Sequence, residues 1–144
     1  MKIHLATDHA GFAHKEALKK MLIEGGYEII DHGATTLDPY DDYPDFMTPC
    51  AEAVAADTES RGIIFGKSGE GEAMVSNRVR GVRAVVYYGG SDDIITLSRM
   101  HNDANMLSIG AGFVSVEETF RVVELWLATP FSGEERHVRR INKF

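Results

Sequence analysis

Short apolar segments alternate with longer amphipathic segments along the whole chain, and this alternation constrains the fold more than any other feature. Five apolar segments are expected to form strands, at residues 2–7, 27–33, 61–66, 82–89 and 105–110. Each precedes a segment expected to form a helix, at residues 12–26, 47–59, 72–79, 91–102 and 114–130. Regular strand–helix alternation predicts an α/β fold, with a parallel sheet covered by helices on both faces.

The length and composition limit the classes of protein to which the chain could belong. At 144 residues the chain is expected to form a single domain, residues 1–144, that buries a core without disulfides. A net charge of −7 argues against a nucleic-acid or membrane-surface partner. No apolar run approaches the ~18 residues of a membrane span, and no secretory signal precedes Asp8, so we expect a cytoplasmic protein. The single cysteine, Cys50, is expected to be a small buried side chain.

The predicted architecture indicates where a ligand would bind. In open parallel sheets, ligands bind outside the carboxyl ends of the strands. The candidate segments are therefore those that follow the predicted strands: Thr7–His9, Asp38–Pro44, Gly66–Gly71, Tyr87–Ser91 and Gly110–Gly112.

The segment Gly66–Gly71 combines three glycines and a serine between a strand and a helix. It is not a P-loop, and Met74 stands where a G-x-G-x-x-G motif would need its third glycine. Backbone N–H groups at such a junction favour an anion, although a tight structural turn explains the composition equally well. Glu72 follows in the first helical turn, where it could complement the helix dipole or act as a base. A base there would need an apolar pocket or a neighbouring anion to raise its pKa.

Histidine and arginine residues supply the remaining candidates. Asp8-His9 follows the first strand, and His101-Asn102 ends a predicted helix, where a histidine could simply be a cap. Arg136 and Arg140 share a helical face in a cationic tail that could clamp a phosphate or could be a solvated face. No H-E-x-x-H pattern supports a metal site. Together these residue types suit proton transfer next to a carbonyl, without a metal or a redox cofactor.

Five segments in this order resemble one known family, the type B ribose-5-phosphate isomerases with the related galactose-6-phosphate isomerase subunits. They are DHAG (8–11), DYPD (42–45), GIIFGKSGEGEAMVSNR (62–78), RMHNDANMLSIG (99–110) and RHVRR (136–140). The resemblance implies a Rossmann-like three-layer α/β/α sandwich with a five-stranded parallel sheet. It also implies a cofactor-independent aldose–ketose isomerase acting on a sugar phosphate. The assembly would be a homodimer or dimer of dimers with shared active sites, and a C-terminal helix near residues 132–143 would reach the partner subunit.

The resemblance also implies roles for individual residues. One branch of the family uses a cysteine as base where Gly66 stands here, and the other uses a glutamate that Glu72 matches. Glu72 would move a proton through a cis-enediolate, with Ser68 positioning it and His101 and Asp8 opening the sugar ring. The remaining contacts to sugar or phosphate would come from His9, Tyr43, Gly66, Lys67, Gly69, Glu70, Gly71, Asn102, Arg136, His137 and Arg140. Of these, the tail residues, together with His101, would come from the partner subunit.

One position departs from the family pattern. Gly112 stands where family members usually carry a phosphate-binding arginine, and Lys67 could compensate for it. Three readings therefore remain open: a ribose 5-phosphate isomerase, an isomerase of another aldose with or without phosphate, and a non-catalytic module that binds a small anion.

Overall fold

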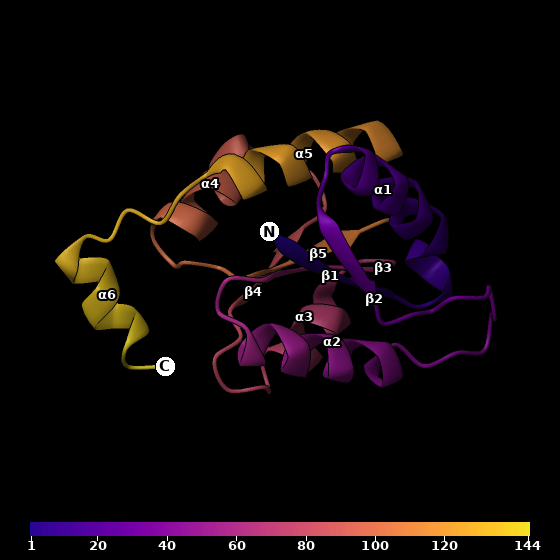
Figure 1. Cartoon of the computed structure of the whole chain (residues 1–144), viewed down its shortest axis with the longest axis horizontal. Coiled ribbons are helices and arrows are strands. Elements are labelled where there is room, and N and C mark those ends of the chain that lie inside the picture. The colour runs from indigo at the N-terminus through magenta and orange to yellow at the C-terminus, as the bar shows by residue number, and fades with distance from the viewer.

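The computed structural model describes all 144 residues and shows the predicted alternation of strands and helices (Figure 1). The strands are β1 Lys2–Thr7, β2 Glu28–Asp31, β3 Arg61–Gly66, β4 Ala84–Tyr87 and β5 Met106–Gly110. The helices are α1 Phe12–Glu24, α2 Pro44–Ala56, α3 Glu70–Ser76, α4 Asp92–Met100, α5 Val116–Ala128 and α6 Glu135–Ile141, with a 3-10 turn at His9–Gly11. No helix combines the length and the apolar character that crossing a membrane requires.

The five strands form one sheet in the order β2-β1-β3-β5-β4, and every neighbouring pair is parallel. All carboxyl ends therefore lie along one edge, as predicted. The chain places β2 on one side of β1 and then crosses to β3 on the other side. This reversal creates a switch point between β1 and β3, which is the preferred place for a ligand in such sheets.

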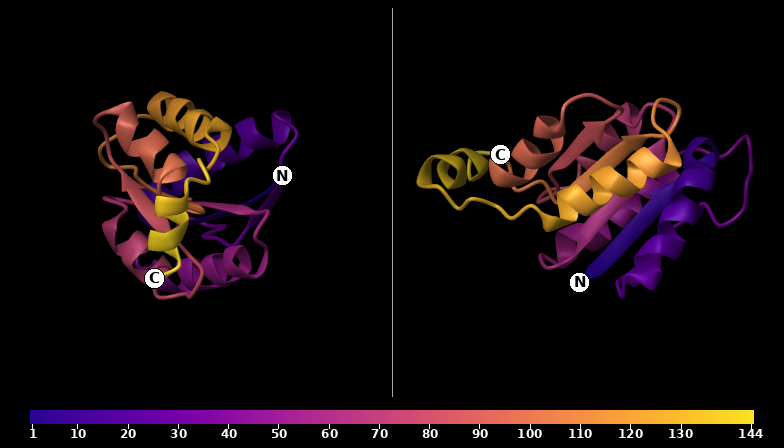
Figure 2. Two further views of the ribbon diagram at one scale, coloured as in Figure 1. Left: turned by 90° about the vertical axis from the view of Figure 1, so that its left-hand side faces the viewer. Right: turned by 90° about the horizontal axis from the view of Figure 1, so that it is seen from above.

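Alternate side chains of each strand enter two separate cores. Ile63 and Phe65 pack in the larger core with residues of α1, α4 and α5, whereas Ile64 packs in the smaller core with Met47 and Cys50 of α2. The two views agree that α1, α4 and α5 cover one face and α2 and α3 the other (Figures 1 and 2). Strands covered on both faces need apolar residues at nearly every position, and this explains the uninterrupted apolar runs.

Two helices begin earlier than the sequence pattern predicted. Helix α2 begins at Pro44 rather than at Met47, because the fixed φ of proline and its missing N–H suit a first helical turn. Helix α3 begins at Glu70 rather than at Glu72, so both glutamates lie in its first turn. The expectation that Cys50 is buried is confirmed.

A buried ion pair ties α1 to β2 and gives a first prediction. Lys15 has no solvent exposure, and its ammonium nitrogen lies 2.7 Å from each carboxylate oxygen of Asp31. Asp31→Asn removes the buried partner and leaves the ammonium with only the more exposed carboxylate of Glu16, 3.0 Å away. Breaking a buried pair in this way typically costs about 3–5 kcal/mol. We expect a loss of that size in the free energy of unfolding, measured by urea denaturation. The control is Asp57→Asn, which breaks the half-exposed contact with Lys2 and should have a much smaller effect. Equal losses in the two variants would contradict the prediction.

Candidate active site

Two groups of the predicted residues gather at opposite ends of the sheet. We call the first the sheet-edge cluster; it contains Asp8, His9, Tyr43, Glu72 and the loop Gly66–Gly71. We call the second the tail cluster; it contains His101, Asn102, Arg136, His137 and Arg140.

The glycine loop of the sheet-edge cluster is fixed against the end of β5. The hydroxyl of Ser108 donates to the carbonyl oxygen of Gly69 at 2.6 Å. The backbone N–H groups of Ala111 and Gly112 donate to the carbonyls of Gly66 and Lys67, each at 2.9 Å. Gly69 has a φ of +82°, a conformation that favours glycine, and it is the N-cap residue of α3. The loop is therefore held by its own backbone, which leaves its side chains available for a ligand.

Glu72 lies directly over Gly66. A Cβ atom added at residue 66 would overlap the carboxylate of Glu72, so the absent side chain makes room for the glutamate. Glu72 is only 5% exposed. Burial raises the pKa of its carboxyl and the charge of Asp8 raises it further, while a hydrogen bond from its own backbone N–H opposes them. Glu72 thus has the environment that a carboxylate base beside a helix N-terminus requires.

Asp8 and His9 follow β1 and face the loop after β2. Asp8 accepts a hydrogen bond from the backbone N–H of Ala10 at 2.9 Å and so caps the turn at residues 9–11. The ring Nδ1 of His9 lies 2.6 Å from Oδ1 of Asp41, and this hydrogen bond raises the pKa of His9. Asp41 belongs to a loop that the sequence marked as a candidate segment, but no motif singled this aspartate out. Only the contact between the two loops reveals it.

Asp8, His9 and Asp41 place donor atoms within 4.8 Å of one another, a spacing that a metal ion could use. A carboxylate can only accept, so the hydrogen bond to Asp41 requires the proton on Nδ1 of His9. That nitrogen then has no lone pair for a metal. The absence of a metal cofactor stays a prediction.

Tyr43 and Lys67 complete the sheet-edge cluster from either side of the loop. A Cβ atom at Gly71 would lie 2.9 Å from the ring of Tyr43, so this ring packs against the loop. A Cβ atom at Gly112 would lie 3.0 Å from Cγ of Lys67, so the lysine stem occupies the space that a larger residue 112 would need.

The other two loop side chains lie on its outer surface. Ser68 accepts a hydrogen bond from the backbone N–H of Glu70 at 3.3 Å. Both residues line a cavity of 230 Å³ together with Tyr88 and Phe113. The expectation that Glu70 is exposed is confirmed.

The tail cluster lies at the opposite end of the sheet because α4 is a crossover. This helix leaves the carboxyl end of β4 and returns to the amino end of β5, so His101 and Asn102 follow it at the amino edge. The rings of His101 and His137 stack with centroids 4.2 Å apart and planes 13° apart. Burial lowers the pKa of His137, and the neighbouring His101 and Arg136 lower it further.

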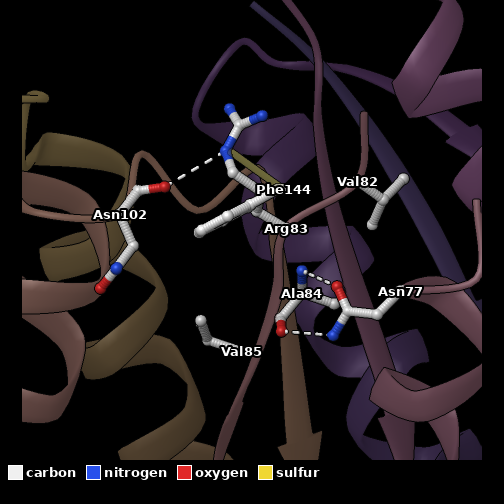
Figure 3. A pocket seen from close by; sticks show the side chains of 7 residues that line it. All are labelled: Asn77, Val82, Arg83, Ala84, Val85, Asn102 and Phe144. Carbon is white, nitrogen blue, oxygen red and sulfur yellow. Dashed lines mark hydrogen bonds between the residues drawn. The ribbon is translucent and has the colours of Figure 1, made fainter. Parts of the chain in front are cut away.

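Two further contacts anchor the tail cluster. The carbonyl oxygen of Asn102 accepts a hydrogen bond from Nε of Arg83 at 3.2 Å, beside a cavity of 400 Å³ that Phe144 also lines (Figure 3). Arg136 pairs with Glu134 at 2.8 Å, whereas Arg140 is exposed and makes no ion pair within the chain. Arg140 thus presents an uncompensated charge on α6.

The two clusters do not meet within one chain. Helix α6 stands at the end of the molecule opposite the loop that follows β2 (Figures 1 and 2). His101 and Asp8 of a single copy are therefore too far apart to act on the same sugar ring. The family resemblance predicts that the tail residues and His101 come from a partner subunit, and the separation within one chain is compatible with that prediction.

Residues 3–144 match the family model described as Ribose/Galactose Isomerase. The ribose-5-phosphate isomerase B of Mycolicibacterium paratuberculosis is 38% identical over 142 residues, which cover 99% of this chain and 88% of that protein. The structure of the Clostridium thermocellum ribose-5-phosphate isomerase B is 38% identical with a TM-score of 0.92, covering 99% of this chain and 94% of the other. The Mycoplasma genitalium enzyme, solved with bound ribulose-5-phosphate, is 34% identical with a TM-score of 0.93, covering 99% and 92%.

Proposed function

The chain belongs to the ribose/galactose isomerase family, and we propose that it interconverts ribose 5-phosphate and ribulose 5-phosphate. The observation that carries this proposal is the buried carboxylate of Glu72 at the switch point of the sheet, beside a loop fixed by its own backbone. The Mycoplasma genitalium enzyme, whose structure holds ribulose-5-phosphate, has the same fold over nearly its whole length. Membership of a family of isomerases also favours an enzyme over a non-catalytic anion-binding module.

In the proposed reaction Glu72 takes the proton from C2 of the open-chain aldose and returns it to C1, while the hydroxyl proton on the C2 oxygen passes to the C1 oxygen. The intermediate is a cis-enediolate. The backbone N–H groups from Ser68 to Gly71 would stabilise the negative charge on its oxygens. A raised pKa makes the ionised carboxylate a stronger base, so the burial of Glu72 favours the first proton transfer. Asp8 and His101 would first open the ring by exchanging a proton with its hydroxyl and its ring oxygen.

The direct test is a comparison of substrates. We expect the highest kcat/KM with ribose 5-phosphate, and lower values with unphosphorylated ribose and with six-carbon aldose 6-phosphates. A higher kcat/KM with one of the other sugars would overturn the choice of substrate without overturning the reaction class. Gly112 is the observation that favours such an outcome, because an arginine at that position would hold phosphate in the wider family.

Lys67 is proposed to hold the phosphate in place of that arginine. Its stem packs over Gly112, and its ammonium group makes no ion pair within the chain, so its charge is available to a ligand. We expect Lys67→Ala to raise KM for ribose 5-phosphate about tenfold, the effect of losing one charge-assisted contact. The KM for unphosphorylated ribose should not change. The exposed Lys20→Ala is the matched control, and an equal change of KM in both variants would contradict the assignment.

We further propose that each active site combines the sheet-edge cluster of one subunit with the tail cluster of a partner. The separation of the clusters in one chain supports this, as do the exposed apolar residues Ile94 and Leu97 on α4, which are 44% and 41% exposed. Such a surface suits contact with a second copy.

Mixing two inactive variants tests the shared site. Glu72→Gln disables the sheet-edge cluster and His101→Asn disables the tail cluster, so a mixed dimer contains one intact site. After unfolding and joint refolding of equal amounts, we expect activity to recover to about a quarter of wild type. The control mixes Glu72→Gln with Asp8→Asn, both in the sheet-edge cluster, and should recover nothing. Recovery in neither mixture would mean that each site is built from one chain.

A further inference from the structure

Asp41 makes two hydrogen bonds to one residue, His9. Its Oδ1 atom accepts from the ring Nδ1 of His9 at 2.6 Å and from the backbone N–H of His9 at 3.1 Å. The Asp41 side chain is 9% exposed, whereas the ring of His9 is 39% exposed. A buried carboxylate thus fixes both the backbone and the ring of a residue whose outer side faces solvent.

The chemistry of this contact determines which nitrogen of His9 is free. A carboxylate has no proton to donate, so Nδ1 must carry one. The other nitrogen, Nε2, makes no hydrogen bond within the chain and lies on the far side of the ring. The groups that face His9 are all acidic: Asp41, then Asp8 with an oxygen 4.0 Å from Nδ1, then Asp38. They raise the pKa of His9 against the opposing effect of burial, and in the protonated ring Nε2 is a donor as well.

The second oxygen of Asp41 indicates that stability alone does not explain this residue. Oδ2 is buried and accepts no hydrogen bond within the chain. A buried acceptor without a partner reduces stability, so a residue selected only for stability would not leave one. The role of Asp41 therefore lies in its two hydrogen bonds to His9.

We propose that Asp41 is a positioning residue, which holds the His9 ring in one orientation so that its Nε2–H donates to the phosphate of the sugar substrate. This inference rests on the proposed function insofar as His9 is taken to contact the phosphate. It adds to the site a residue that does not touch the substrate and acts only through His9.

The first test needs no substrate. In ¹⁵N NMR titrations of the full-length protein, His9 should titrate at a higher pH than it does in Asp41→Asn, with its signal identified by its loss in His9→Gln. Asp41→Asn should move the signal toward the neutral ring, whereas Asp42→Asn, an exposed neighbour without a side-chain hydrogen bond, should leave it in place. An unchanged signal in folded Asp41→Asn would overturn the proposal. So would tight binding of Zn²⁺ through Nδ1 of His9, identified from the ring ¹⁵N shifts, because that nitrogen would then carry no proton to donate to Asp41.

The second test separates positioning from general loss of structure. Asp41→Asn should raise KM for ribose 5-phosphate and the inhibition constant for inorganic phosphate by about tenfold, with kcat nearly unchanged. The KM for unphosphorylated ribose and all constants of Asp42→Asn should match wild type. A fall in kcat at constant KM would overturn the proposal, and Asp41→Ser serves as a second variant if Asp41→Asn does not fold. Wild-type protein that turns over no sugar phosphate would refute the proposed function instead, while the NMR result would still decide whether Asp41 controls His9.

Discussion

Glu72→Gln is expected to lower kcat by at least about a hundredfold, since a positioned general base contributes 10²–10⁴ to a rate. Glutamine keeps the size of the side chain and cannot accept the C2 proton, so the substrate should still bind. Turnover of ribose 5-phosphate and calorimetric titration with ribulose 5-phosphate measure the two effects separately. Near-normal turnover by this variant would mean that another group is the base.

A control and a pH profile sharpen this result. Glu52→Gln removes an exposed carboxylate on α2 that is not part of either cluster, and should leave kcat unchanged. Because burial raises the pKa of Glu72, the ionised base is lost as the pH falls through that raised value. The acid limb of kcat/KM should therefore lie above the ordinary glutamate pKa of 4.5. An acid limb at or below that value would show that the buried carboxylate does not control the reaction.

Gly66→Ala is expected to have a comparable effect on kcat, about a hundredfold, although it adds only one methyl group. The added Cβ would overlap the carboxylate of Glu72, and β3 cannot shift easily because Gly66 pairs with Gly110 at the buried end of the sheet. The glutamate must therefore leave its position. By the same overlap, any side chain at residue 66 excludes the present position of the Glu72 carboxylate.

A double-mutant cycle distinguishes displacement of Glu72 from general overpacking. If Gly66→Ala acts only by moving the carboxylate, it should lower kcat little in the Glu72→Gln background. Gly62→Ala is the matched control in the same strand, because its Cβ would lie 2.8 Å from Met106 and meet no group of the site. We expect Gly62→Ala to cost stability but not kcat. Fully additive losses for Gly66→Ala and Glu72→Gln would contradict the displacement.

Local sequence motifs predicted the part of the site that lies directly after the strands. Strand–loop–helix junctions placed Asp8 and Glu72 at the carboxyl edge, because every parallel strand ends there. The sequence indicated that a base at residue 72 would need a raised pKa, but it could not show that the pKa of Glu72 is raised. The residues that bury its carboxyl are distant in sequence. Asp41 was missed because an acidic loop without periodicity gives no sign of which carboxylate turns inward. The start of α2 at Pro44 was missed because a proline marks a loop and a first helical turn alike.

The sequence by itself determined the class of fold, the segments that form it and the family, because periodicity and motif order are local properties of the chain. Only the tertiary structure decided the strand order, the position of the Glu72 carboxylate where a Cβ at residue 66 would lie, and the contact of Asp41 with His9. It also decided that His101 lies at the far end of the sheet from Glu72. These are relations between segments that meet only after the sheet has assembled, since a crossover helix reverses direction and a buried side chain takes its environment from elements remote in sequence.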